Sequence, residues 1–173
     1  MVDGLDNTII INSINKGEIK GNTETGGIVG YNCGSITNCA NLGKIKATSG
    51  VGGIAGQYYF TTSIIENSYN AGIIEDSDNN KGAVIGMIFP VSTKVTLNNI
   101  FWYEKTANNA IASGENYKEG ETIRITKDQL ISTSEEGLLK KLNTYVENYN
   151  SQNEEKIENW KIDVETGYPI PNI

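Results

Sequence analysis

A short pattern of apolar and polar positions recurs through roughly the first hundred residues. An asparagine stands between two apolar positions, with one residue separating it from each. This alternation has a period of two, so it predicts a β-strand whose asparagine and apolar neighbours share one face, which we expect to point inward. The asparagine column is Asn12, Asn38, Asn67 and Asn99; the apolar columns are Ile10, Ile36, Ile65 and Leu97 before it, and Ile14, Ala40, Tyr69 and Phe101 after it.

Glycines repeat in step with this pattern. Single glycines follow each asparagine element, and we expect them to mark a corner that needs a positive φ or a close backbone approach. A glycine-rich box then starts another short strand, whose central apolar residues should stack on one another. The corner glycines are Gly17, Gly43 and Gly72; the boxes begin at Gly26, Gly52 and, in degenerate form, Gly82; the stacked apolar residues are Ile28, Ile54 and Val84.

The spacing of the copies predicts the architecture. The asparagine elements lie 26 and 29 residues apart and the glycine boxes 26 and 30, which is a period typical of stacked repeats. We therefore predict an all-β fold: a parallel β-helix, or β-solenoid, over residues 1–102, with about 3–4 coils and about three short strands in each coil. In such a stack each buried asparagine can pair its amide with the asparagines above and below, which offsets the cost of burying it.

Beyond Phe101 the repeat fades, and residues 103–173 are predicted to form a small α+β capping region with two short helices and a terminal strand and turn. We expect this region to cover the open end of the solenoid, where strand edges would otherwise be exposed. The signals are a capping box at Thr126 and Gln129, a helix start at Thr133 and Glu136, an apolar helical stripe at Leu138, Leu142, Tyr145 and Tyr149, a polar loop at 148–155, a strand at 160–163 and a turn at 166–169.

Composition excludes several functions. The chain of 173 residues carries a net charge of −7 and one arginine, Arg124, so we expect it to bind neither nucleic acid nor anionic membranes. It contains no histidine, which removes a Ser-His-Asp triad, a Cys-His pair and histidine-ligated zinc. Cys39 is expected to be a buried thiol, although a local disulfide with Cys33 stays open as the alternative. No apolar run approaches the roughly 18 residues of a membrane-spanning helix.

The repeat resembles the GLUG-motif repeats of bacterial cell-surface proteins. The resemblance rests on the boxes at 27–30 and 53–56, on the degenerate box at 83–86, and on a tail that runs from Asn99 to Tyr168-Pro169. It implies a piece of a larger secreted or wall-attached protein, adhesin-like or adjacent to an IgA-peptidase domain. We find no signal peptide before Asp3 and no anchor after Ile173, so an extracellular form is expected to be part of a longer chain. The resemblance brings no catalytic residues and no cofactor.

Oxygen-bearing side chains offer the first candidate site. Asp76, Asp78 and Asn80 have the first three ligand spacings of a calcium loop, but Lys81 and Met87 replace the glycine and glutamate that an EF-hand requires. A looser calcium site made of oxygen ligands is the remaining metal hypothesis. Catalytic use of carboxylates would involve Glu66, Glu75, Asp76 or Asp78, and would place two acids about 5–10 Å apart in a cleft.

Aromatic residues offer the second candidate site. Tyr58, Tyr59 and Phe60 follow the second glycine box within an insertion, where exposed rings would bind a glycan or a protein. The competing interpretation is a loop folded against the solenoid.

Three functional hypotheses follow from these observations. The first is a non-enzymatic, surface-exposed solenoid module that serves in adhesion or as a spacer, is located outside the cell or at its surface, and has a host or cell-surface glycan or protein and its neighbouring domains as partners. The second is a carbohydrate-active β-helix. The third is an accessory region of a surface protease.

Overall fold

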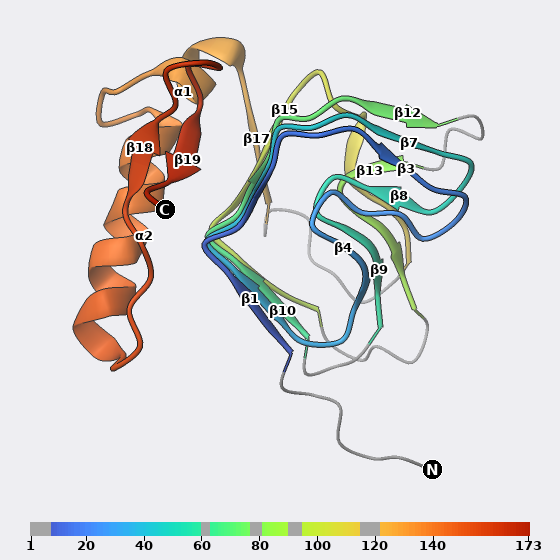
Figure 1. Cartoon of the computed structure of the whole chain (residues 1–173), viewed down its shortest axis with the longest axis horizontal. Coiled ribbons are helices and arrows are strands. Elements are labelled where there is room, and N and C mark those ends of the chain that lie inside the picture. Colours follow the sequence, from blue (N-terminus) through green and yellow to red (C-terminus); the bar gives the residue numbers. More distant parts are fainter. Residues whose placement is uncertain (1–7, 60–62, 77–80, 90–94, 115–121) are drawn as a thin grey trace.

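The computed structural model describes residues 8–59, 63–76, 81–89, 95–114 and 122–173. Parallel strands wrap around a common axis and form an all-β solenoid of about three turns, followed by a small part made of helices and strands. The coils superpose in the view of Figure 1, and the C-terminal part lies beside them. The predicted fold class is therefore confirmed.

Among the described residues, each sheet of the solenoid gains its strands from successive coils. The first sheet contains β1 (Ile9–Ile11), β5 (Ser35–Thr37), β10 (Ile64–Glu66) and β14 (Thr96–Asn98). The second contains β2 (Ile14–Asn15), β6 (Ala40–Asn41), β11 (Tyr69–Asn70), β15 (Ile100–Tyr103) and β17 (Thr122–Ile125). The third contains β3 (Ile19–Lys20), β7 (Ile45–Ala47) and β12 (Ile74–Asp76). The fourth contains β4 (Val29–Asn32), β9 (Ala55–Tyr58), β13 (Lys81–Ile88) and β16 (Asn109–Ser113), with β8 (Val51–Gly52) paired to β13.

The asparagine column forms a corner rather than the middle of a strand. Asn12, Asn38, Asn67 and Asn99 all have positive φ values, between 43° and 62°. Asparagine tolerates this left-handed conformation better than other residues that carry a side chain. The corner divides the predicted strand into two, so the coils build four sheets, where about three short strands in each coil were expected. It also breaks the alternation of sides, so the expectation that both apolar columns face inward is wrong.

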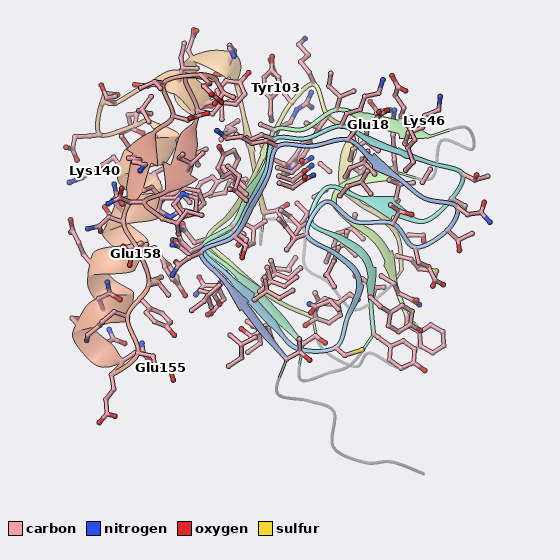
Figure 2. The ribbon with its side chains drawn as sticks, viewed as in Figure 1. Glu18, Lys46, Tyr103, Lys140, Glu155 and Glu158 are labelled. Carbon is pink, nitrogen blue, oxygen red and sulfur yellow. The ribbon has the colours of Figure 1, made fainter. Side chains whose placement is uncertain are left out.

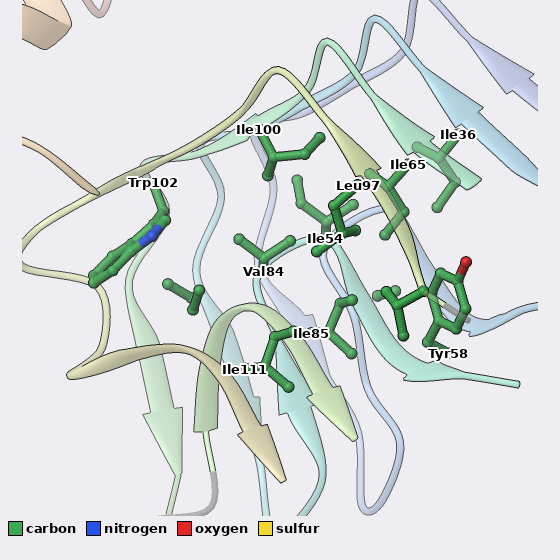
Figure 3. Close-up of a cluster of buried hydrophobic side chains, with 14 of the residues drawn as sticks. Ile36, Ile54, Tyr58, Ile65, Val84, Ile85, Leu97, Ile100, Trp102 and Ile111 are labelled. Carbon is green, nitrogen blue, oxygen red and sulfur yellow. The ribbon is translucent and has the colours of Figure 1, made fainter. Parts of the chain in front are cut away.

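The two apolar columns face opposite sides of the chain. Ile36 and Ile65, before the corner, are buried inside the solenoid, whereas Tyr69 and Phe101, after it, pack against the C-terminal part. The interior position after the corner is filled instead by Cys39 and its equivalents. Figure 3 shows the inner cluster, in which Ile54 and Val84 from the glycine boxes lie with Ile36, Ile65 and Leu97, as the stacking of the boxes predicts.

The predicted asparagine ladder is present. Asn38 Nδ2 donates to Asn12 Oδ1 over 2.7 Å, Asn67 Nδ2 to Asn38 Oδ1 over 2.7 Å, and Asn99 Nδ2 to Asn67 Oδ1 over 2.6 Å. These bonds satisfy amides that are fully buried at Asn38 and Asn67. The ladder therefore stabilises the stack at each left-handed corner.

A second asparagine ladder, which the sequence pattern did not predict, runs through β2, β6 and β11. Asn15 Nδ2 donates to Asn41 Oδ1 and Asn41 Nδ2 to Asn70 Oδ1, each over 2.8 Å. Each of these asparagines also accepts a hydrogen bond from the backbone N–H two residues later. Trp102 occupies the next position, and the Asn70 Nδ2 group has no partner among the described residues.

The corner glycines are needed for close backbone approach. A Cβ atom at Gly43 would lie 2.1 Å from the Gly17 carbonyl oxygen, and one at Gly72 would lie 2.0 Å from that of Gly43. Such distances are far shorter than van der Waals contact, so a side chain would force the coils apart. Neither glycine has a positive φ, so close approach is the reason that applies here.

The C-terminal part packs on the side of the solenoid, so the expectation that it covers the open end is wrong. It consists of α1 (Lys127–Ile131), α2 (Leu138–Gln152) and an antiparallel pair, β18 (Trp160–Ile162) with β19 (Pro169–Pro171). Its apolar side chains cover the outward-facing column of Ala40, Tyr69 and Phe101. It is placed there because the asparagine corner turns that column outward, where water would otherwise contact it.

Polar contacts fix this lateral packing. Trp160 Nε1 donates to Asn38 Oδ1, and the Glu158 N–H donates to Asn12 Oδ1 over 3.0 Å. Lys16 of the first coil pairs with Asp163 over 2.9 Å. Figure 2 shows Glu158 between the solenoid and the helices. The C-terminal part is therefore anchored on the asparagine ladder itself.

The boundaries differ from those expected in three places. The capping box of Thr126 and Gln129 begins α1 as predicted. The second helix, however, begins after Gly137 instead of near Thr133, and it continues to Gln152 through part of the expected loop. Strands β16 and β17 pair with the solenoid sheets, so the solenoid extends beyond residue 102 to Ile125.

Two further observations complete the fold. Cys33 and Cys39 are not joined by a disulfide, and burial raises the pKa of the fully buried Cys39 thiol to about 11. In the described ranges, neither helix combines the length and the apolar character that crossing a membrane requires.

Candidate functional site

An aromatic column lies at the outer edge of the fourth sheet. The ring of Tyr59 is 4.9 Å from that of Tyr31 and 4.6 Å from that of Phe89, measured between centroids. The three residues come from consecutive coils, at or just beyond the ends of β4, β9 and β13. Tyr31 is 42% exposed, and the other two are partly exposed. We call Tyr31, Tyr59 and Phe89 the aromatic column.

The stacking of coils positions these rings. The Tyr59 N–H donates to the Asn32 carbonyl over 3.1 Å, and the Phe89 N–H donates to the Tyr58 carbonyl over 2.9 Å. These bonds continue the parallel ladder past the strand ends, where neighbouring chains lie about 4.8 Å apart. Partial burial, followed by the proximity of Tyr59, raises the pKa of Tyr31, so its phenol stays neutral near pH 7.

Sequence reasoning located only part of this surface. Tyr59 belongs to it, and Phe60 lies outside the described residues. Phe89 was missed, although it follows its glycine box at the same distance as Tyr59 follows its own. Tyr31 was missed because it stands closer to its box and reaches Tyr59 diagonally.

Tyr58 is not part of an exposed surface, so its prediction as a ligand-binding residue is wrong. Its side chain is fully buried; its hydroxyl donates to the Ser63 carbonyl and accepts from the Thr96 N–H over 3.0 Å. Figure 3 shows it at one edge of the inner cluster of apolar side chains. Successive strand residues point to opposite faces, so Tyr58 points inward and Tyr59 outward.

The calcium hypothesis stays a prediction. Asp76 is the last residue of β12, whereas Asp78 and Asn80 lie outside the described residues. Within the described ranges, no group of three or more acidic, cysteine or histidine side chains is placed to hold a metal ion.

A polar groove separates α2 from the first sheet. Its cavity volume is about 370 Å³, and its lining includes Glu66, Asn98, Tyr145 and Tyr149. Asn98 Nδ2 donates to Glu66 Oε1 over 3.3 Å. Burial, and then the nearby Glu66 carboxylate, raises the pKa of Tyr145. Of the described residues that line this groove, Glu66 is the one carboxylate, so the pair of acids that a glycosidase needs is not assembled there.

A second groove follows the outer side of the third sheet, with a volume of about 650 Å³. Lys20, Lys46 and Lys81 line it together with Glu75, whose carboxylate pairs with Lys44 over 2.7 Å. The Lys44 ammonium group lowers the pKa of Glu75 and keeps it ionised. Figure 2 places Lys46 and Glu18 beside β3, β7 and β12. On this face Lys46 lies opposite Glu75 in one neighbouring strand and opposite Lys20 in the other, and such a mixture of charged side chains is typical of a solvated sheet face.

The comparisons with known proteins agree with the repeat. Residues 21–46 match the family model described as the GLUG motif, and this match covers one period of the solenoid, from the end of β3 into β7. No curated protein matches the chain, and no solved structure does. The resemblance seen in the sequence is thus confirmed: this chain is a β-solenoid repeat module that carries a GLUG motif.

Proposed function

We propose that this module is a non-enzymatic, surface-exposed binding region of a larger secreted or wall-attached bacterial protein, and that it holds a glycan on the aromatic column. The observation that carries the proposal is the run of three stacked rings at the outer edge of the fourth sheet, with centroid spacings of 4.9 and 4.6 Å. Spread over three coils, these rings form a ridge long enough to contact more than one sugar unit.

The chemistry of the ridge suits a saccharide. Aromatic rings offer flat apolar faces to the C–H faces of sugars, and the tyrosine hydroxyls add hydrogen-bonding groups at the rim. Tyrosine also provides contact area at a low conformational-entropy cost. Here the cost is lower still, because each ring is already packed against its neighbour and its backbone is tied to the previous coil.

A non-catalytic role is supported by the residue types available. The sequence has no histidine, and the polar groove holds one described carboxylate, Glu66. The proposed location outside the cell rests on the GLUG motif, through the resemblance of the repeat to those of bacterial cell-surface proteins. Both statements remain proposals.

The test is a binding screen of the purified chain against immobilised glycans, mucin and matrix proteins, with and without calcium. We expect saturable binding to a glycan, weakened about tenfold or more by Tyr59→Ala and by Tyr31→Ala. Tyr103→Ala is the matched control, because Tyr103 is a partly exposed tyrosine in the second sheet, outside the column.

Three results would contradict the proposal. Absence of binding would leave a spacer role, and binding that survives both column substitutions would place the site elsewhere. Binding that requires calcium and is unaffected by the column substitutions would favour the segment around Asp76 as the binding site. The circular dichroism spectrum of each variant must match that of the parent chain. A loss of binding can then be attributed to the missing ring and not to unfolding.

A further inference from the structure

The first coil carries a glycine that its own surroundings do not require. Gly43 and Gly72 need to be glycine because a Cβ atom would meet the carbonyl of the preceding corner glycine within 2.1 Å. At Gly17, the equivalent position, the nearest atom of a described residue to a Cβ is Asn15 Oδ1 at 3.6 Å, which is ordinary contact. Its glycine becomes necessary only when another coil is stacked against it.

The two asparagine ladders also end with unused capacity at this coil. Asn12 Oδ1 accepts two hydrogen bonds, but its Nδ2 group has no acceptor among the described residues. Asn41 Oδ1 accepts both the Gly43 N–H and Asn15 Nδ2, whereas Asn15 Oδ1 accepts only the Gly17 N–H within the described ranges. One ladder therefore ends in a free donor and the other in a free acceptor position.

The backbone of the first coil is open in the same direction. Strands β1, β2, β3 and β4 all lie at the ends of their sheets among the described residues. In the second coil, the Ala40 and Leu42 N–H groups donate to the Ser13 and Asn15 carbonyls. The equivalent N–H groups of the first coil belong to Ile14 and Lys16 and point to the open side. Ile9 is 61% exposed at the same edge.

We propose that this face, the first-coil edge, is a docking surface for one further solenoid coil with the same asparagine and glycine positions. Such a coil would supply an Oδ1 atom to Asn12 Nδ2, an Nδ2 group to Asn15 Oδ1, carbonyl oxygens to the Ile14 and Lys16 N–H groups, and a glycine carbonyl beside Gly17. Each of these groups is what the first coil supplies to the second.

The opposite end of the solenoid does not offer this surface, which argues against head-to-tail stacking of a second copy. There the second sheet continues to β17, one strand beyond β15, while among the described residues the third sheet stops at β12. An incoming β2 would have to pair with β17 while an incoming β3 pairs with β12, and in the part of the chain that the structure describes these two strands belong to different levels of the stack. Because the sheets end at different levels there, the first coil of a second copy could not pair with all of them at once.

The test compares the same substitution in two contexts. In the first, the chain is unchanged; in the second, residues 8–33 occur twice in tandem, so that a copied coil can stack on the original one. We expect the duplicated chain to remain monomeric and to melt in one transition at a higher Tm. Hydrogen exchange at the original Ile14 and Lys16 amides should be slower in it.

Gly17→Ala is the decisive variant. In the unchanged chain it should leave the Tm the same or slightly higher, whereas Gly43→Ala should lower it clearly. In the duplicated chain, Gly17→Ala in the downstream copy should lower the Tm by about 5 °C or more. Within each chain, Gly17→Ala should leave glycan binding through the aromatic column unchanged, because Gly17 lies outside the column; the duplicated chain is compared only with itself, since its copied coil carries a second Tyr31. The outcome is therefore independent of the proposed function.

Several outcomes would overturn the proposal. One is a Gly17→Ala effect in the unchanged chain as large as that of Gly43→Ala, which would show a local role for this glycine without any added coil. Another is a Gly17→Ala substitution that leaves the Tm unchanged in both the unchanged and the duplicated chain. If sedimentation shows that the unchanged chain dimerises and that Gly17→Ala prevents it, the occupant is a second copy instead.

Discussion

Replacing Asn67 tests how much the outer ladder contributes to the fold. Asn67 is fully buried and has a φ of 43°; its amide donates to Asn38 over 2.7 Å and accepts from Asn99 over 2.6 Å. Asn67→Ala removes both bonds, at about 1 kcal/mol each, and places an alanine in the left-handed region at a cost of about 1 kcal/mol. We therefore expect the free energy of unfolding to fall by about 3 kcal/mol.

Asn67→Gly separates the two contributions, because glycine adopts a positive φ without strain. It should lose the same two hydrogen bonds and cost about 2 kcal/mol. The assay is equilibrium urea unfolding followed by circular dichroism and tryptophan fluorescence. Asn109→Ala is the control, since Asn109 is an exposed asparagine in β16 and should change stability by less than about 0.5 kcal/mol.

The reasoning would be refuted in either of two ways. Equal losses for the alanine and glycine variants would show that the left-handed corner imposes no cost. Losses as small as that of Asn109→Ala would show that the ladder contributes nothing measurable beyond what water offers the same amides. A changed denaturant slope would point instead to loss of two-state unfolding.

Three further predictions concern other parts of the molecule. The Lys16 ion pair lowers the folded-state pKa of Asp163, so its stabilisation should be complete above about pH 4 and lost as the pH falls through that lowered pKa; acid titration of Trp160 fluorescence should show less acid sensitivity in Asp163→Asn. Gly53→Ala should lower the Tm markedly in a thermal melt, because its Cβ would lie 2.0 Å from a backbone carbonyl of the next coil. Cys39 should resist a thiol reagent at pH 8 until urea unfolds the chain, because burial raises its pKa to about 11.

The sequence was sufficient for the features that depend on register. The similar spacing of asparagines and glycine boxes predicted parallel stacking, the Asn12 to Asn99 ladder and the stacked box residues, because successive coils repeat the same contacts. The capping box at Thr126 was also predictable, since its hydrogen bonds join residues close in sequence. Hydrogen bonds between residues close in sequence, and contacts that recur from coil to coil, can both be predicted from a single sequence.

The remaining features depend on information that the hydrophobic pattern lacks. A period of two assumes that every residue has a β conformation, and it cannot reveal the positive φ at Asn38 that reverses the side chains beyond it. Tyr58 was predicted to be exposed for another reason: it was assigned to an insertion together with Tyr59, whereas β9 continues to Tyr58 and its alternation turns this side chain inward. In the aromatic column, Tyr31 stands closer to its glycine box than Tyr59 and Phe89 stand to theirs. A comparison of the repeats position by position therefore does not align Tyr31 with the other two rings.

The reversal at the asparagine corner explains why the solenoid is capped on its side. Once Ala40, Tyr69 and Phe101 face outward, they form an apolar strip along the stack, and the helices and Trp160 bury that strip while bonding to the ladder. The strip runs parallel to the stacking axis, so covering it leaves the first-coil edge open. Coils can therefore be added at that edge without disturbing the contacts that hold the cap, which allows this part of the chain to end a longer array while still presenting the aromatic column.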